Sequence, residues 1–231
     1  MGKTQRAALS RNSSGNIYGT TKFGASCGTV FKLTGSLLAT LYTFSCGNDG
    51  GKPDSSVVLD NNGNLFGTTG LYGPHGDANG GGVVYEISNS GTFSILYSFC
   101  SSANCSDGSS PDAGVVMASE NVIWGTTAYG GNKTCNCGTV FKLTTSGSSW
   151  NETVVHRFIG GTHDGANPFT APTISVQTVG GKKQLVIFGV TETGGGANLG
   201  TVFEVLKSNH GYAFRLLHSF NGADRNAPLA R

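Results

Sequence analysis

Apolar and polar residues alternate along many short segments of this chain. In the segment 30–33, Val30 and Lys32 would point to one side of an extended strand, and Phe31 and Leu33 to the other. No segment of any length shows the periodicity of an amphipathic helix. The pattern therefore predicts an all-β chain built from short antiparallel strands, because tight turns rich in Gly, Asn and Ser separate the alternating segments.

The alternation belongs to a repeat. The phrase Gly-Asn-Ile-Tyr-Gly-Thr-Thr at 15–21 returns at 63–69, again at 121–127, and more loosely at 186–191. A second phrase follows each copy: Gly-Thr-Val-Phe-Lys-Leu at 28–33 and its counterparts at 82–87, 138–143 and 200–205. Repeated units of this length bury their apolar faces against their neighbours. A residue present in every copy therefore most simply serves the repeat itself.

Each repeat contains four candidate strands. The first follows a proline, the two phrases form the second and third, and Leu-Tyr-Thr-Phe at 41–44 or its counterpart forms the fourth. Four antiparallel strands in a repeat of about 40–50 residues or slightly more are typical of a β-propeller blade. The sequence predicts one β-propeller domain over 1–231, with four four-stranded antiparallel blades at approximately 6–45, 54–100, 112–159 and 169–220. Residues 221–231 begin a further repeat, so the blades form either a closed ring or an arc of a larger propeller.

The same motifs carry a resemblance. The order Asp-Gly-x-x-Pro, Gly-Asn-Leu-Tyr-Gly-Thr-Thr, Gly-Gly, Gly-Thr-Val-Phe-Lys-Leu and Leu-Tyr-Ser-Phe resembles the GloVer tandem-repeat family of bacterial proteins. The resemblance implies a secreted or cell-surface protein. It implies no particular activity, because the family has none assigned. The fourth copy departs from the pattern. It has the single Thr191 where the other copies have a pair of threonines, and Gly180-Gly181 replaces the Asp-Asn-Gly turn.

Charge and hydropathy argue against two classes of partner, nucleic acids and the membrane interior. Charged residues make up 12% of the chain and the net charge is +2, so no broad basic surface for nucleic acid is expected. No apolar run is long enough for a membrane span, so no membrane insertion is expected in this chain. Residues 1–11 lack an apolar signal core, so either the protein is intracellular or its signal and anchor lie outside this sequence; we expect the second. An open arc would expose apolar blade faces and favour self-association.

The six cysteines favour an oxidising compartment. Cys27 precedes the third strand of its repeat and Cys46 follows the fourth, so the hairpin register predicts a Cys27–Cys46 disulfide. Cys100 and Cys105 flank a short loop and would close it. The pairing of Cys135 and Cys137 stays open: they would bridge each other across one residue, or pair with Cys100 or Cys105 in the neighbouring blade. No zinc-binding spacing is present, and neither a metal nor a cofactor is expected.

Loops after the second and fourth strands emerge on one face of every blade, and they are the long ones. In propellers such a face commonly carries the binding site, because rigid strands present variable loops. The recurring Asp49, Asp107, Asp164 and Asp224 are interpreted as turn caps. Non-recurring residues in the long loops are the candidates for ligand binding: Tyr72, His75, Asp77, Tyr129, His163 and Glu192.

No catalytic motif stands out, and the 13 acidic residues do not select a pair. The favoured hypothesis is a non-catalytic surface domain that binds a glycan or a protein through the long-loop face. A propeller-type glycan hydrolase or lyase is the first alternative. A purely structural spacer of a larger surface protein is the second.

Overall fold

The structure is a computed structural model that describes residues 9–23, 27–147, 149–179, 181–208 and 211–224. These residues form an all-β fold, whose one helical element is a three-residue 3-10 turn, Ala103–Cys105. The start of the first predicted blade (6–8) and most of the further repeat (225–231) lie outside the described residues. Four antiparallel sheets of four strands follow one another in chain order, and each is a meander.

Strand positions follow the repeat. The first sheet contains β1 (Ser10–Arg11), β2 (Ile17–Thr21), β3 (Thr29–Thr34) and β4 (Leu37–Thr43). The second contains β5 (Val58–Leu59), β6 (Leu65–Thr69), β7 (Val83–Ile87) and β8 (Phe93–Ser98). The third contains β9 (Val115–Ser119), β10 (Val122–Thr127), β11 (Thr139–Ser146) and β12 (Ser149–Arg157).

The fourth sheet has the longest strands. It contains β14 (Thr173–Val179), β15 (Lys182–Thr191), β17 (Thr201–Ser208) and β18 (Gly211–Ser219). The short strands β13 (Gly165–Ala166) and β16 (Thr193–Gly194) form a separate two-stranded sheet beside it. The predicted hairpin pattern is therefore confirmed in all four repeats.

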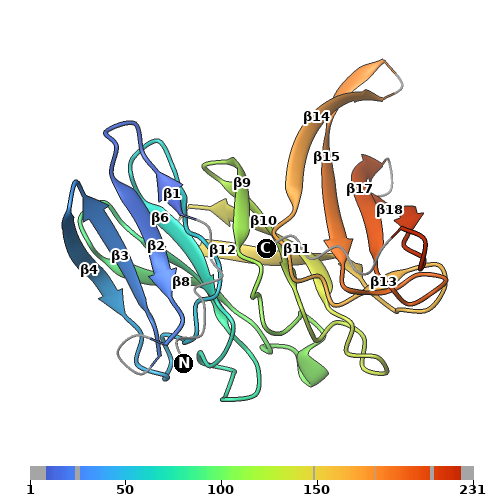
Figure 1. Cartoon of the computed structure of the whole chain (residues 1–231), viewed down its shortest axis with the longest axis horizontal. Coiled ribbons are helices and arrows are strands. Elements are labelled where there is room, and N and C mark those ends of the chain that lie inside the picture. Colours follow the sequence, from blue (N-terminus) through green and yellow to red (C-terminus); the bar gives the residue numbers. More distant parts are fainter. Residues whose placement is uncertain (1–8, 24–26, 148, 180, 209–210, 225–231) are drawn as a thin grey trace.

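Figure 1 shows the sheets arranged in a row, with the first and the fourth at its opposite ends. Contacts between neighbours are made by β8 with β12, by β12 with β18, and by β9 with β5 and β14. The row does not close in this view, so the four-bladed ring that the sequence allowed is not confirmed.

Three apolar cores lie between successive sheets, and alternation along each strand assigns its residues to one core or the next. In β6, Leu65 packs toward the first sheet, whereas the adjacent Phe66 packs toward the third. In β10, Ile123 packs toward the second sheet and Trp124 toward the fourth. Both faces of an inner sheet are thus buried, which explains why its strands carry apolar residues on both sides.

The recurring glycines and prolines also pack closely against each other between successive sheets. A β-carbon on Gly28 would lie 2.5 Å from Pro53, and one on Gly82 would lie 2.7 Å from Pro111. In each case the proline opens the next repeat. Close approach of this kind requires glycine, and the motif spacing therefore reflects packing between repeats.

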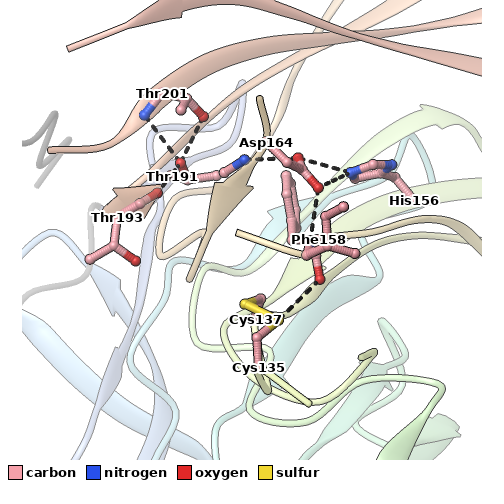
Figure 2. Close-up of polar contacts among 10 residues, drawn as sticks. Cys135, Cys137, His156, Phe158, Asp164, Thr191, Thr193 and Thr201 are labelled. Carbon is pink, nitrogen blue, oxygen red and sulfur yellow. Dashed lines mark hydrogen bonds and ion pairs between the residues drawn. A yellow bond between two sulfur atoms is a disulfide. The ribbon is translucent and has the colours of Figure 1, made fainter. Parts of the chain in front are cut away.

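The recurring aspartates cap the loops after the fourth strands, as predicted. Asp164 accepts hydrogen bonds from the backbone N–H groups of Ile159 and Gly165, and its oxygens lie 3.1 and 3.2 Å from His156 Nε2. Figure 2 shows this aspartate beside His156 and close to the paired hydroxyls of Thr191 and Thr201, which are 2.8 Å apart. Asp49, Asp107 and Asp224 make the equivalent contacts in the other repeats.

All six cysteines are joined in disulfides. Cys27 pairs with Cys46 and Cys100 with Cys105, which are the pairings that strand register and loop length predicted. Cys135 pairs with Cys137, so the bridge to a neighbouring blade is wrong. Asn136, between these two cysteines, has a φ of 54°. This left-handed conformation, which asparagine tolerates, accompanies the tight turn that brings the two cysteines together.

Candidate functional site

A hollow of about 950 Å³ opens on the long-loop face, between the second and third sheets. Three loops build it: 70–82 after β6, 99–114 after β8 and 128–138 after β10. Each follows a second or a fourth strand, so the hollow lies on the face that the sequence singled out. Its wall includes His75, Asp77, Asn79, Ser101, Ser102, Asn104, Ser109, Tyr129 and Asn136.

The three loops are tied to one another by hydrogen bonds. Ser109 and Tyr129 exchange two backbone hydrogen bonds, of 2.8 and 3.0 Å. The Ser109 hydroxyl accepts a third from the backbone N–H of Gly81 at 3.0 Å. The backbone N–H of Gly131 donates to the carbonyl of Cys105 at 2.9 Å. The hollow is therefore formed by loops in fixed positions, which lowers the entropy cost of binding a ligand.

The buried Asp107 holds the middle loop in place. Its carboxylate accepts hydrogen bonds from the Tyr97 hydroxyl at 2.9 Å and from the Ser101 backbone N–H at 3.0 Å. The Cys100–Cys105 disulfide closes the same loop. A recurring turn cap thus positions the non-recurring residues that follow it.

The structure brings three of the six predicted residues together. His75, Asp77 and Tyr129 line the hollow, and the side chains of all three are exposed. Tyr72 lies below them, where it packs against the first apolar core. His163 lies in the loop after β12, where its Nδ1 is 2.7 Å from the Thr162 hydroxyl. The predicted set is thus split between this hollow and other places in the fold.

Tyr129 is the aromatic side chain of the hollow. It is 39% exposed, and its ring packs edge-on against Phe169 at 5.9 Å. Burial raises the pKa of its hydroxyl, and the negative charges of Asp112 and Glu192 raise it further. Glu192 therefore lies close enough to affect Tyr129, although it does not line the hollow.

A second group of charged residues, Lys22, Asp54 and Asp112, does not line the hollow. Lys22 forms an ion pair with Asp54 at 2.7 Å. The pKa of Asp112 is raised to about 6: burial is the main cause, Lys22 opposes the rise and Asp54 contributes to it. These residues occupy corresponding places after β2 and after the prolines that open the second and third repeats. Because the three residues come from three successive repeats, we interpret their charge interactions as contacts that hold the repeats together.

Sequence reasoning missed most of the polar wall. Asn79, Ser101, Asn104 and Asn136 are ordinary loop residues in the sequence, and only loop length distinguished their segments. Together they supply amide and hydroxyl groups that donate and accept hydrogen bonds. Asp77 is the one carboxylate among the described residues that line the hollow. No cluster of three or more His, Cys, Asp or Glu side chains able to hold a metal occurs within the described part of the chain.

Comparison with protein families matches this chain to the Gloeobacter/Verrucomicrobia repeat, over residues 1–184 and, in a second overlapping match, over 71–231. Together the two matches span the whole sequence. No curated protein matches it. Within the described ranges, no helix is long and apolar enough to cross a membrane.

Proposed function

Because the chain belongs to the Gloeobacter/Verrucomicrobia repeat family, we propose that its four sheets are successive blades of a β-propeller-type domain that binds ligands at the cell surface or outside the cell. Four-stranded antiparallel meanders packed face to face through apolar cores support the propeller interpretation. Three disulfides support an oxidising location.

The proposed ligand is a glycan, and the hollow lined by His75, Asp77 and Tyr129 is its site. One observation carries this proposal: three of the non-recurring residues converge on a single hollow, whose wall also contains the hydroxyl and amide side chains of six Ser and Asn residues. Sugars present alternating hydroxyl groups and apolar C–H faces. A wall with many short polar side chains and one exposed aromatic ring suits both.

The chemistry of the wall argues against the other ligand classes. No lysine or arginine is among the described residues that line it, so a polyanion would find no counter-charge. A glycosidase requires two carboxyl groups flanking the scissile bond, whereas the described wall supplies only Asp77. A spacer without a ligand is the remaining alternative, and a binding experiment decides it.

We expect the purified chain to bind a subset of immobilised glycans, and the affinity for the best of them to be measurable by calorimetry. Tyr129→Ala and Asn79→Ala should each weaken binding by about tenfold, because stacking and hydrogen-bond contacts of this kind are worth about 1–1.5 kcal/mol. His163→Ala is the matched control, since His163 is an exposed loop residue outside the hollow.

Two results would count against the glycan site. If no glycan binds, the spacer function is favoured. If His163→Ala weakens binding as much as Tyr129→Ala does, the ligand occupies another surface. Each variant is compared with the wild type by its thermal midpoint, so that a folding defect is separated from a binding defect.

Light scattering coupled to size exclusion tests the arrangement of the blades. A monomer of 23.7 kDa would mean that the four sheets form a self-sufficient unit. A dimer or larger species would mean that the outer blade faces associate, as expected for an open arc.

A further inference from the structure

The fourth sheet departs from the repeat, and its departure creates a second hollow. β14 and β15 have seven and ten residues, whereas their counterparts β5 and β6 have two and five. Figure 1 shows this hairpin projecting well beyond the strands around it. A hollow of about 330 Å³ lies between the third sheet and the turn-end part of the fourth sheet, where Lys183, Gln184 and Leu185 of β15 line it. It lies at the hairpin-turn end of the sheets, opposite the long-loop face.

The inner wall of this hollow is apolar and aromatic. The Trp124 and Tyr212 rings meet edge-on at 5.3 Å, with Leu185, Ile187 and Val205 beside them. Trp124 is 1% exposed, and its indole Nε1 is buried with no hydrogen-bond partner in the described structure. A buried N–H group without an acceptor is unfavourable, because it has lost its hydrogen bonds to water. An acceptor brought by a ligand would remove this cost.

Three lysines surround the aromatic wall. Lys142 Nζ lies 5.9 Å from the centre of the Trp124 ring and 6.0 Å from that of Tyr212. Lys183 and Lys207 line the same hollow from β15 and β17. No acidic side chain is among its described lining residues, and no described ion pair involves any of the three lysines. The hollow therefore combines an apolar floor with an excess of positive charge.

The cluster is specific to this place in the molecule. Between the first and second sheets, Lys32 lies over Tyr18 at 5.9 Å, which repeats the Lys142–Trp124 contact. Between the second and third sheets, Glu86 occupies the corresponding position. Lys183 and Lys207 have no lysine counterpart in either case: counted from the motif glycines, their places are taken by Asn61 and Asn89 in the second repeat and by Ser119 and Thr145 in the third. Packing between repeats thus requires at most one lysine here, and the other two need a different explanation.

We propose that this second hollow binds a small organic anion with a flat aromatic body. The body would lie against Tyr212 and Leu185, beside the buried Trp124, and the anionic group would face the Lys142, Lys183 and Lys207 ammonium groups. The volume is at the lower end of the range for small-molecule sites, about 300–1,000 Å³, which restricts the body to one or two fused rings. Cationic nitrogens hydrogen-bonded to an anion give stronger contacts than neutral donors do.

The test uses naphthalene-2-sulfonate and its neutral counterpart, naphthalene-2-sulfonamide. The protein has two tryptophans, so its ¹⁵N–¹H spectrum contains two indole signals, and Trp150→Phe identifies that of Trp124. We expect the sulfonate to shift the Trp124 signal and to bind at least tenfold more tightly than the sulfonamide. The Trp150 signal, from the neighbouring interface, should stay in place.

Lysine variants complete the test. The double variant Lys183→Gln and Lys207→Gln should weaken sulfonate binding by about tenfold or more and leave sulfonamide binding unchanged, because each charge-assisted contact is worth about 1.5–3 kcal/mol. Lys133→Gln is the control and should bind as the wild type does, since Lys133 is exposed in the loop between β10 and β11, on the opposite, long-loop face. Equal affinities for the two compounds, or a Trp124 signal that neither compound shifts, would overturn the proposal.

Discussion

Gly125 and Phe141 face each other across β10 and β11, and the ring of Phe141 lies where a side chain of Gly125 would be. The same pairing occurs in every sheet: Gly19 with Phe31, Gly67 with Tyr85, and Gly189 with Phe203. In the last three sheets the aromatic ring is fully buried against the preceding sheet. The glycine of the Tyr-Gly-Thr-Thr phrase is thus needed because the aromatic ring of the next strand packs directly on its backbone.

Gly125→Ala is expected to destabilise the fold by about 1–3 kcal/mol, because an added methyl group in a filled core forces the surrounding side chains to move. Gly222→Ala is the control, since a β-carbon there meets no atom within 4 Å. Urea unfolding followed by fluorescence measures both. Equal midpoints for the two variants would contradict the close approach of the Phe141 ring.

Asp107→Asn tests the turn cap that holds the loop-face hollow. Asp107 is 3% exposed, and one carboxylate oxygen accepts from the Tyr97 hydroxyl, the Ser101 backbone and the Ser101 hydroxyl. The other oxygen accepts from the Ser102 backbone N–H at 3.3 Å. An asparagine would place a neutral oxygen at the first position and an NH₂ donor at the second, so we expect a loss of about 1–3 kcal/mol in stability. Asp224→Asn, at the more exposed equivalent position, should cost less than half as much in the same thermal or urea measurement.

The motifs predicted the strands and their connections because these features repeat and each copy supports the others. Gly125, Pro53 and Asp107 recur because the same packing contact or turn is made in each repeat, and repeated contacts of this kind can be recognised in the sequence. The hollows could not be predicted in the same way. His75 and Tyr129 were selected only because they do not recur, and the same argument selected Tyr72 and His163, which lie elsewhere. Which loops meet depends on how neighbouring sheets pack. Lys183 lies in a hairpin that is longer than its counterparts, and nothing in the sequence indicated which residues lie beside it.

The disulfides are expected to contribute unequally to stability. Cys27 and Cys46 are 19 residues apart, whereas Cys100 and Cys105 are five apart. In the chain-entropy account the longer loop gives about 3 kcal/mol and the shorter about 2 kcal/mol. The double serine variant of the first pair should therefore have the lower urea midpoint. A larger loss from the second pair would mean that its main role is to fix the loop around the hollow.

Glu152 interrupts a pattern that the other interfaces share. Phe93 stacks on Tyr42 at 4.1 Å between the first and second sheets, and Phe214 stacks on His156 at 3.8 Å between the third and fourth. By strand register, Glu152 takes that place between the second and third sheets. Its Oε1 is buried without a hydrogen-bond partner among the described residues.

The pKa of Glu152 is raised to about 7, mainly by burial and to a smaller extent by the negative charge of Asp107, and against the opposing effect of Arg157. Because the folded-state pKa is above that of the unfolded chain, folding is favoured while the carboxyl stays protonated. This contribution is full below about pH 4.5 and is lost as the pH rises through 7. Glu152→Gln has no such titration, so its stability relative to the wild type should increase between pH 5 and pH 8.

Glu152→Phe goes one step further, since it restores the aromatic stack, here on Tyr97. We expect this variant to be more stable than the wild type at both pH values, with the larger gain at pH 8. Thermal midpoints of the three proteins at pH 5 and pH 8 separate the two effects: the charge alone distinguishes the wild type from Glu152→Gln, and packing distinguishes Glu152→Gln from Glu152→Phe. A gap between wild type and Glu152→Gln that does not change with pH would show that the carboxyl is hydrated in solution. Loss of stability in Glu152→Phe would show that the second and third sheets are too close for the ring that the other two interfaces contain.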